Sequence, residues 1–98
     1  MSKKDVYIYP AVFEEEGGGY NVEFPDLEGV FTCGDDLRDA LFMAEDVLGL
    51  YLYTLEEDNT EIPESGSADG IKIRNNQFIQ LIEVYMPQVR EEQKNRYI

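Results

Sequence analysis

Histidine and tryptophan are absent from this 98-residue sequence, and cysteine occurs once, at Cys33. Without histidine, the chain can form no histidine-based catalytic triad, no histidine general base and no histidine-ligated zinc site. A single cysteine excludes an intrachain disulfide and a zinc site built from several thiolates. The sequence therefore predicts no catalytic residue, no metal site and no cofactor, and it predicts that Cys33 is a small core residue rather than a reactive thiol.

Long apolar runs are lacking as well. None approaches the ~18–20 residues that span a bilayer, and no signal-peptide stretch follows the polar start at residues 1–5. We expect a cytoplasmic protein without membrane contact. The length suits one domain. A hydrophobic content of 43%, with seven Tyr and five Phe, is enough for a folded core.

Positive charge is scarce, with 8 Lys and Arg against 21 Asp and Glu, for a formal net charge of −13. Arg38 is the only base between Asp5 and Glu64, whereas bases outnumber acids from Ile71 onward. A protein with this net charge repels nucleic acid, because phosphate binding requires Lys and Arg. The same charge attracts a basic partner and raises the rate of association with it. Charge alone is equally compatible with a role in solubility.

The apolar pattern predicts four strands and one long helix. Three of the strands are close in sequence and should form an antiparallel meander. The helix follows them, packs on one face of the sheet and precedes the last strand. The fold class is therefore α+β, in the order β-β-β-α-β. The predicted strands cover residues 6–13, 20–24, 30–33 and 77–85.

Three strand features carry further expectations. Pro10 cannot donate to a ladder, so its part of the first strand should lie on an edge or at a bulge. Residues 14–19, Glu-Glu-Glu-Gly-Gly-Gly, are typical of a solvated turn. The strand at 77–85 is apolar on both faces, which favours a central or doubly covered position.

The helix should begin with Asp35 or Asp36 as its cap, because either side chain can accept a hydrogen bond from a first-turn N–H. Gly49 interrupts it at a cost of about 1 kcal/mol relative to Ala, so we expect another element to approach closely there. The residues at helical spacing form one apolar stripe. They are Leu37, Ala40, Leu41, Ala44, Leu48, Tyr51, Leu52 and Leu55.

Two motifs precede and open this helix: Phe-Pro-Asp-Leu-x-Gly at 24–29 and Thr-x-Gly-Asp at 32–35, followed by Ala40-Leu41. Together with the segment at 9–13, they resemble the HicB antitoxin family over about residues 5–55. The combined pattern is fairly specific, although each piece alone is weak.

The resemblance implies a partial RNase H-like fold that binds and blocks HicA, a small basic toxin that cleaves RNA. It implies an antitoxin rather than an enzyme. Many members add a C-terminal domain that dimerises and binds operator DNA. Residues 1–88 are then the toxin-binding domain, and 89–98 are a polar tail or the start of a linker to a DNA-binding domain that this sequence does not include. DNA binding is expected only through that domain.

Eight residues are the candidates for partner contact. Six are acids near the strands, which could face a basic partner or form a solvated rim. Two are aromatic residues that, like Gly49, lie off the apolar stripe; they could anchor a partner or mark a helix that is buried more widely than the stripe. The candidates are Glu14, Glu15, Glu16, Glu23, Asp26, Glu28, Phe42 and Tyr53.

Two other functions stay open. One is a standalone interaction or regulatory domain for another basic protein. The other is a degenerate or active RNase H-like nuclease, which needs clustered carboxylates for metal ions. The first strand has no acid at 7–9, where such enzymes place one, and a cluster would have to come from Asp26, Glu28, Asp35 and Asp36. Exposed aromatic residues and a strand edge also make homo-oligomerisation an expectation.

Overall fold

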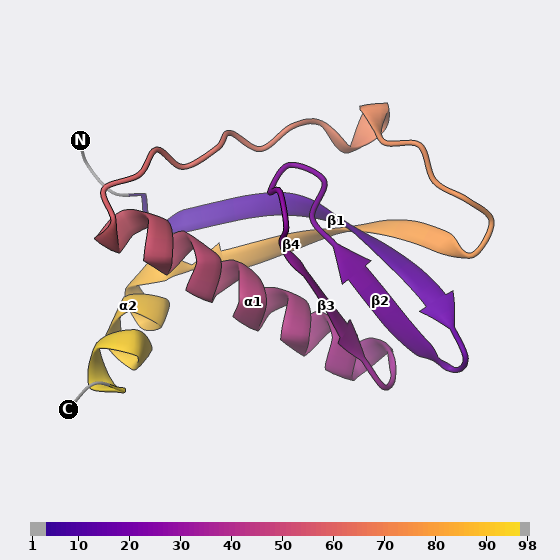
Figure 1. Cartoon of the computed structure of the whole chain (residues 1–98), viewed down its shortest axis with the longest axis horizontal. Coiled ribbons are helices and arrows are strands. Elements are labelled where there is room, and N and C mark those ends of the chain that lie inside the picture. Colours follow the sequence, from indigo (N-terminus) through magenta and orange to yellow (C-terminus); the bar gives the residue numbers. More distant parts are fainter. Residues whose placement is uncertain (1–3, 97–98) are drawn as a thin grey trace.

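A computed structural model describes residues 4–96, and in this range it contains a four-stranded sheet, two α-helices and one short 3-10 helix (Figure 1). This arrangement confirms the predicted α+β class and the predicted order β-β-β-α-β, to which the structure adds η1 before the last strand and a second helix after it. In chain order, the elements are β1 (Val6–Glu16), β2 (Gly19–Glu23), β3 (Phe31–Gly34), α1 (Leu37–Glu57), η1 (Ala68–Gly70), β4 (Gln77–Tyr85) and α2 (Met86–Asn95).

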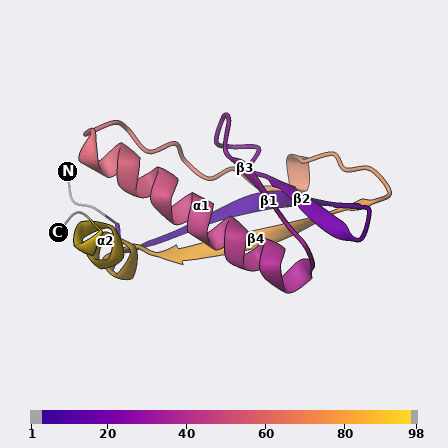
Figure 2. The same ribbon diagram turned by 60° about the horizontal axis from the view of Figure 1, so that its bottom comes forward.

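All neighbouring strands are antiparallel, in the order β3-β2-β1-β4. The predicted meander is therefore confirmed, but the predicted central position of the last strand is wrong. β4 pairs only with β1 and forms an edge of the sheet. Its apolar character on both faces does not reflect double coverage, because α1 lies across one face only (Figure 2) and Leu81 and Tyr85 on the other face are exposed.

The predicted turn at 14–19 is much shorter in the structure. β1 continues through Glu16 and β2 begins at Gly19, so Gly17 and Gly18 alone connect them. Their φ angles of +59° and +88° suit a two-residue hairpin turn that needs positive φ at both positions. Glu14, Glu15 and Glu16 consequently belong to a strand, and their side chains alternate between its faces.

Pro10 lies where β1 has a single neighbour, as predicted. It pairs with Leu81 of β4, whereas the ladder to β2 begins only at Val12. The segment after α1 passes this place, since the Tyr9 hydroxyl donates a hydrogen bond to the Pro63 carbonyl oxygen. The side of β1 that β2 leaves unpaired is therefore held to the long loop that precedes β4.

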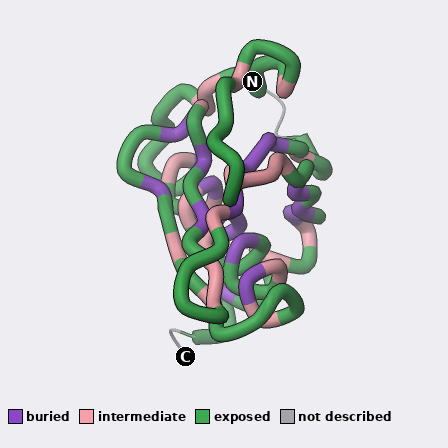
Figure 3. Tube along the Cα trace, turned by 90° about the vertical axis from the view of Figure 1, so that its right-hand side faces the viewer, coloured by how far each residue is buried: buried purple, intermediate pink, exposed green. Residues whose placement is uncertain are grey.

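α1 begins after Asp36, whose carboxylate accepts a hydrogen bond from the Asp39 N–H at 2.7 Å. Ala40, Ala44, Leu48 and Leu52 are fully buried against the sheet, which confirms the centre of the predicted stripe. Leu37, at its start, is exposed. Alanine at the first two buried positions lets the backbone of α1 approach the sheet closely. Figure 3 marks the buried residues along the chain in purple.

The segment predicted as a polar tail forms α2. Pro87 falls in its first turn, where a missing N–H removes no helical hydrogen bond. Met86 is buried and Val89 packs on the core. Val89 is also the close neighbour expected at Gly49, because a Cβ there would lie 3.0 Å from Val89 Cγ2. α2 continues through residue 88, where the sequence predicts the end of the toxin-binding domain. That boundary stays a prediction. Residues 97–98 of the predicted tail lie outside the described residues.

Burial raises the pKa of the Tyr9 phenol to about 12, with nearby Tyr7 and Asp26 adding to the effect. The neutral phenol is favoured in the fold, so this stabilisation is complete below pH 10 and is lost between pH 10 and about 12. We expect Tyr9 to ionise only near pH 12, together with alkaline unfolding. Ultraviolet titration of phenolate against Tyr9→Phe tests this: the variant should lack the step near pH 12, and an unchanged step there would contradict the expectation.

In residues 4–96, no helix is both long and apolar enough to cross a membrane.

Candidate protein-interaction surface

The face of the sheet turned away from α1, here called the open face, carries a row of side chains across all four strands. The strand register places Phe31 beside Glu23, Glu23 beside Val12, and Val12 beside Ile79. Directly paired residues of antiparallel strands point to the same side of the sheet. The row lies opposite the core, because its neighbours along the strands, such as Phe13 and Val22, are the buried ones.

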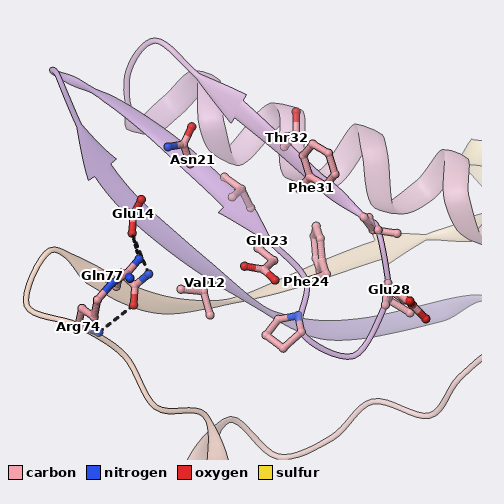
Figure 4. A pocket seen from close by; sticks show the side chains of 15 residues that line it. Val12, Glu14, Asn21, Glu23, Phe24, Glu28, Phe31, Thr32, Arg74 and Gln77 are labelled. Carbon is pink, nitrogen blue, oxygen red and sulfur yellow. Dashed lines mark hydrogen bonds and ion pairs between the residues drawn. The ribbon is translucent and has the colours of Figure 1, made fainter.

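A hollow of about 580 Å³ opens on this face over β1, β2 and β3, and we call it the sheet-face hollow (Figure 4). The sheet supplies its floor, and the turn between β2 and β3 supplies one wall. Its polar and apolar lining residues alternate along the strands. The side chains used below are Val12, Glu14, Glu23, Glu28, Phe31 and Arg74.

The wall is a tight turn that holds Glu28 at the rim. The Phe24 N–H donates to the Val30 carbonyl oxygen at 3.1 Å, and the Leu27 N–H donates to that of Phe24 at 3.0 Å. Leu27 is buried in the core and anchors the turn. Gly29 has a φ of +79°, which side-chain-bearing residues rarely adopt. The turn thus fixes the backbone of Glu28 at the rim of the hollow.

Charge in the hollow divides into a paired and an unpaired part. Glu14 accepts hydrogen bonds from Arg74 and, at 3.0 Å, from Gln77 Nε2. The bond from Arg74 holds the pKa of Glu14 below its usual value. Glu23 and Glu28 make no hydrogen bond or ion pair with other described side chains. They flank Phe31, whose residue is 69% exposed. Two unpaired carboxylates beside an exposed aromatic ring suit a basic protein partner.

The other three predicted acids lie outside the hollow. Alternation along β1 turns Glu15 to the opposite face from Glu14 and Glu16. Glu16 accepts a hydrogen bond from Asn21 Nδ2 at 2.7 Å. Asp26 accepts one from the Gly66 N–H at 2.8 Å and so attaches the long loop to the β2–β3 turn. The structure brings together Glu14, Glu23 and Glu28, and it leaves the others at separate places.

The two aromatic candidates also separate. Phe42 is 58% exposed and lines a second hollow of about 200 Å³ between α1, β4 and α2, together with Glu45, Asp46 and Glu92. Tyr53 is partly buried against the core and lines neither hollow. The interpretation of a helix buried more widely than the stripe therefore fits Tyr53.

The prediction that Cys33 is a core residue is wrong, because Cys33 is exposed. Sequence reasoning also missed Phe31 as a surface residue. Phe31 was placed in the third strand, where alternation with buried Val30 could have indicated its outward direction. It also missed Glu56, which it placed off the apolar stripe. Glu56 is buried and binds Arg90 of α2. The signal was present as an unbroken four-residue spacing along Ala40, Ala44, Leu48, Leu52 and Glu56.

The carboxylates considered for a nuclease do not converge. Across residues 4–96, no group of three or more Cys, Asp or Glu is arranged to hold a metal ion. Asp36 caps α1, and Asp26 is bonded to Gly66. What the arrangement does offer is an extended polar and apolar surface of the kind that proteins use to bind one another.

Fold and surface together define an acidic α+β domain with one uncovered sheet face. Residues 9–96 match the family described as the HicB_like antitoxin of bacterial toxin-antitoxin system, and the chain belongs to this family. The resemblance inferred from the motifs at 24–41 is thereby confirmed.

Relatives in other organisms match a little over half of the chain. Antitoxin HicB 2 of Photorhabdus laumondii is 42% identical over 55 residues, which are 56% of this chain and 40% of that protein. An uncharacterised 14.9 kDa protein of Haemophilus phage HP1 is 34% identical over 58 residues, which are 59% of this chain and 44% of that protein. The matched part thus spans less than half the length of these relatives.

Solved structures show the same fold. A chain of a toxin-antitoxin complex from Streptococcus pneumoniae superposes with a TM-score of 0.78 at 24% identity, over 85% of this chain and 71% of that one. The N-terminal domain of Burkholderia pseudomallei antitoxin HicB gives 0.66 at 18% identity, over 78% and 95%. A chain of a HicA3 and HicB3 complex gives 0.63 at 20% identity, over 80% and 98%.

Proposed function

We propose that this domain neutralises a small basic HicA-type ribonuclease by covering its RNA-binding surface, and that it does so as a non-catalytic cytoplasmic protein. The observation that carries the proposal is the unpaired Glu23 and Glu28 beside exposed Phe31 on the open face. Membership in an antitoxin family supports it, and so does a net charge of −13. DNA binding would belong to a separate C-terminal domain.

The physical basis is competition with phosphate. A ribonuclease holds its substrate with Lys and Arg, and carboxylates at matching places bind the same groups. Phe31 adds apolar contact area that excludes water from the charged pairs around it. The surface can therefore be both attractive at long range and specific at contact.

The direct test mixes the purified domain with the small basic protein encoded beside it and follows RNA cleavage. We expect cleavage to stop near one equivalent. Because exposed charges are screened by salt, the association rate should fall at least about tenfold between 50 and 500 mM NaCl. Continued RNA cleavage with the domain in molar excess would show that the proposal is wrong.

Charge reversal in the sheet-face hollow provides the matching residue-level prediction. Glu23→Lys/Glu28→Lys should raise the Kd for the toxin at least about 100-fold, because attraction becomes repulsion at the contact. The control is Glu61→Lys/Glu64→Lys, which changes net charge equally on the exposed long loop. It should raise the Kd less than about fivefold. Titration calorimetry measures both, and equal losses would place the contact elsewhere.

A further inference from the structure

The outer edge of β4 is an unprotected strand edge. Over residues 4–96, backbone hydrogen bonds of residues 78–85 run only to β1. Within the same range, the Gln80 side chain also bonds this backbone, since its Nε2 donates to the Leu81 carbonyl oxygen at 3.4 Å. Along this nine-residue strand, the N–H and C=O groups that point away from β1 form a template for another strand.

Devices that usually block edge pairing are missing from β4. Its sequence, QFIQLIEVY, has no proline and no lysine, and Glu83 is its single charge. Its register with β1 is continuous from Val6–Tyr85 to Glu14–Gln77, so no bulge twists the edge away. The opposite edge differs, because β3 has four residues and is followed at once by Asp35 and Asp36.

The distribution of charge limits where a second copy can bind. Because the chain has a formal net charge of −13, two copies repel each other except where acidic residues are few. β4 is such a place, since Glu83 is its single charged residue. Exposed apolar side chains lie along this edge on the open face. Tyr85 and its partner Val6 are exposed, and so are Leu81 and Ile8. In an antiparallel pair of β4 strands, the segment before β4 of one copy, which carries Lys72 and Arg74, lies toward the end of the other copy's β4 that carries Glu83.

We propose that β4 pairs antiparallel with β4 of a second copy across a two-fold axis, which makes one eight-stranded sheet. Paired residues must share a face, so an axis at Gln80 sets Ile79 against Leu81 of the other copy. The same axis sets Gln77 against Glu83, so that each carboxylate meets an amide rather than its own copy. Among the residues that line the sheet-face hollow, Gln77 alone belongs to β4, and Glu23, Glu28 and Phe31 lie away from the paired edge. Dimerisation therefore leaves the surface of the proposed function uncovered.

The first test measures mass by sedimentation equilibrium. Wild type should sediment as a dimer, and Leu81→Lys, which places a charge on the edge, should weaken dimerisation at least about tenfold. Phe42→Lys is the matched control, because Phe42 is 58% exposed, Leu81 is 56% exposed and both changes add one positive charge. The control should remain dimeric. A monomeric wild type, or equal effects of the two variants, would overturn the proposal.

Salt and cross-linking separate this proposal from toxin binding. Salt screens the repulsion between like-charged copies, so dimerisation should strengthen as salt rises, opposite to toxin association. In a Cys33→Ser background, Gln80→Cys should form a covalent dimer on oxidation and Gln77→Cys should not, because residue 77 faces residue 83. Cross-linking of Gln77→Cys alone would overturn the register. A monomeric Leu81→Lys variant that still inhibits the toxin would leave the proposed function intact.

Discussion

Replacing Gly34 with alanine is expected to lower the free energy of unfolding by more than about 3 kcal/mol, because the new atom has no room and its neighbours are backbone. An ideal Cβ at Gly34 would lie 2.3 Å from the Ala40 amide nitrogen and 2.5 Å from Ala40 Cα. Gly34 ends β3, and Ala40 is fully buried in the first turns of α1. Relief of the overlap requires α1 to move away from the sheet.

The measurement is urea unfolding followed by circular dichroism, with Gly70→Ala as the control. A Cβ at Gly70 meets nothing within 4 Å, and its φ is not positive. That substitution should change stability by less than about 1 kcal/mol, toward greater stability, since it restricts the unfolded chain. A Gly34→Ala variant within about 1 kcal/mol of wild type would contradict the packing argument. A variant that does not fold, beside a folded Gly70→Ala, would support it.

The sequence was sufficient for features whose causes are local. The spacing of Ala40, Ala44, Leu48 and Leu52 predicted the buried side of α1, and the carboxylate of Asp36 caps that helix as expected. Pro10 signalled a strand position with one neighbour. In each case the cause is local. The helix cap and the helical spacing involve residues a few positions apart, and proline itself lacks the N–H donor that a strand with two neighbours requires.

Features that depend on distant contacts were not predictable in the same way. β4 has the composition of a covered strand, and only the sheet order shows that one side of it is an edge. Glu14 lies in a strand beside the hollow because pairing with β2 continues β1 through Glu16, past the point where the run of glutamates suggests a turn. Asp26 does not lie at the hollow with Glu14, Glu23 and Glu28, because it binds the N–H of Gly66, which is 40 residues away in sequence. Tertiary structure determines such contacts between distant residues.

The second large expected effect concerns Arg90, which connects α2 to α1 and to the start of β1. Its Nε and Nη2 donate to the two carboxylate oxygens of Glu56 at 3.0 and 2.7 Å. Its Nη1 donates to Asp5 at 3.2 Å, and Nη2 also reaches the Lys4 carbonyl oxygen at 2.7 Å. The bonds to Glu56, foremost, and to Asp5 raise the pKa of the guanidinium, which stays charged at every ordinary pH.

Arg90→Ala should lower the free energy of unfolding by about 2–4 kcal/mol, because it leaves the Glu56 carboxylate buried without a partner. The Glu56 side chain is 3% exposed and that of Arg90 is 24% exposed, so solvent cannot replace the lost bonds at Glu56. Arg74→Ala is the control within the same chain. It breaks the pair with Glu14, but Arg74 is 74% exposed, and the expected loss is below about 1 kcal/mol.

The double variant Glu56→Leu/Arg90→Leu decides whether the buried charge is the cause. If it is, removal of both partners should restore stability to within about 1 kcal/mol of wild type, because an apolar pair needs no compensation for lost hydration. If instead the packing of the arginine stem holds α2 in place, the double variant will be as unstable as Arg90→Ala. Since Gly49 lets Val89 pack closely against α1 whatever stands at residue 90, we expect recovery, with α2 still docked by its apolar contacts.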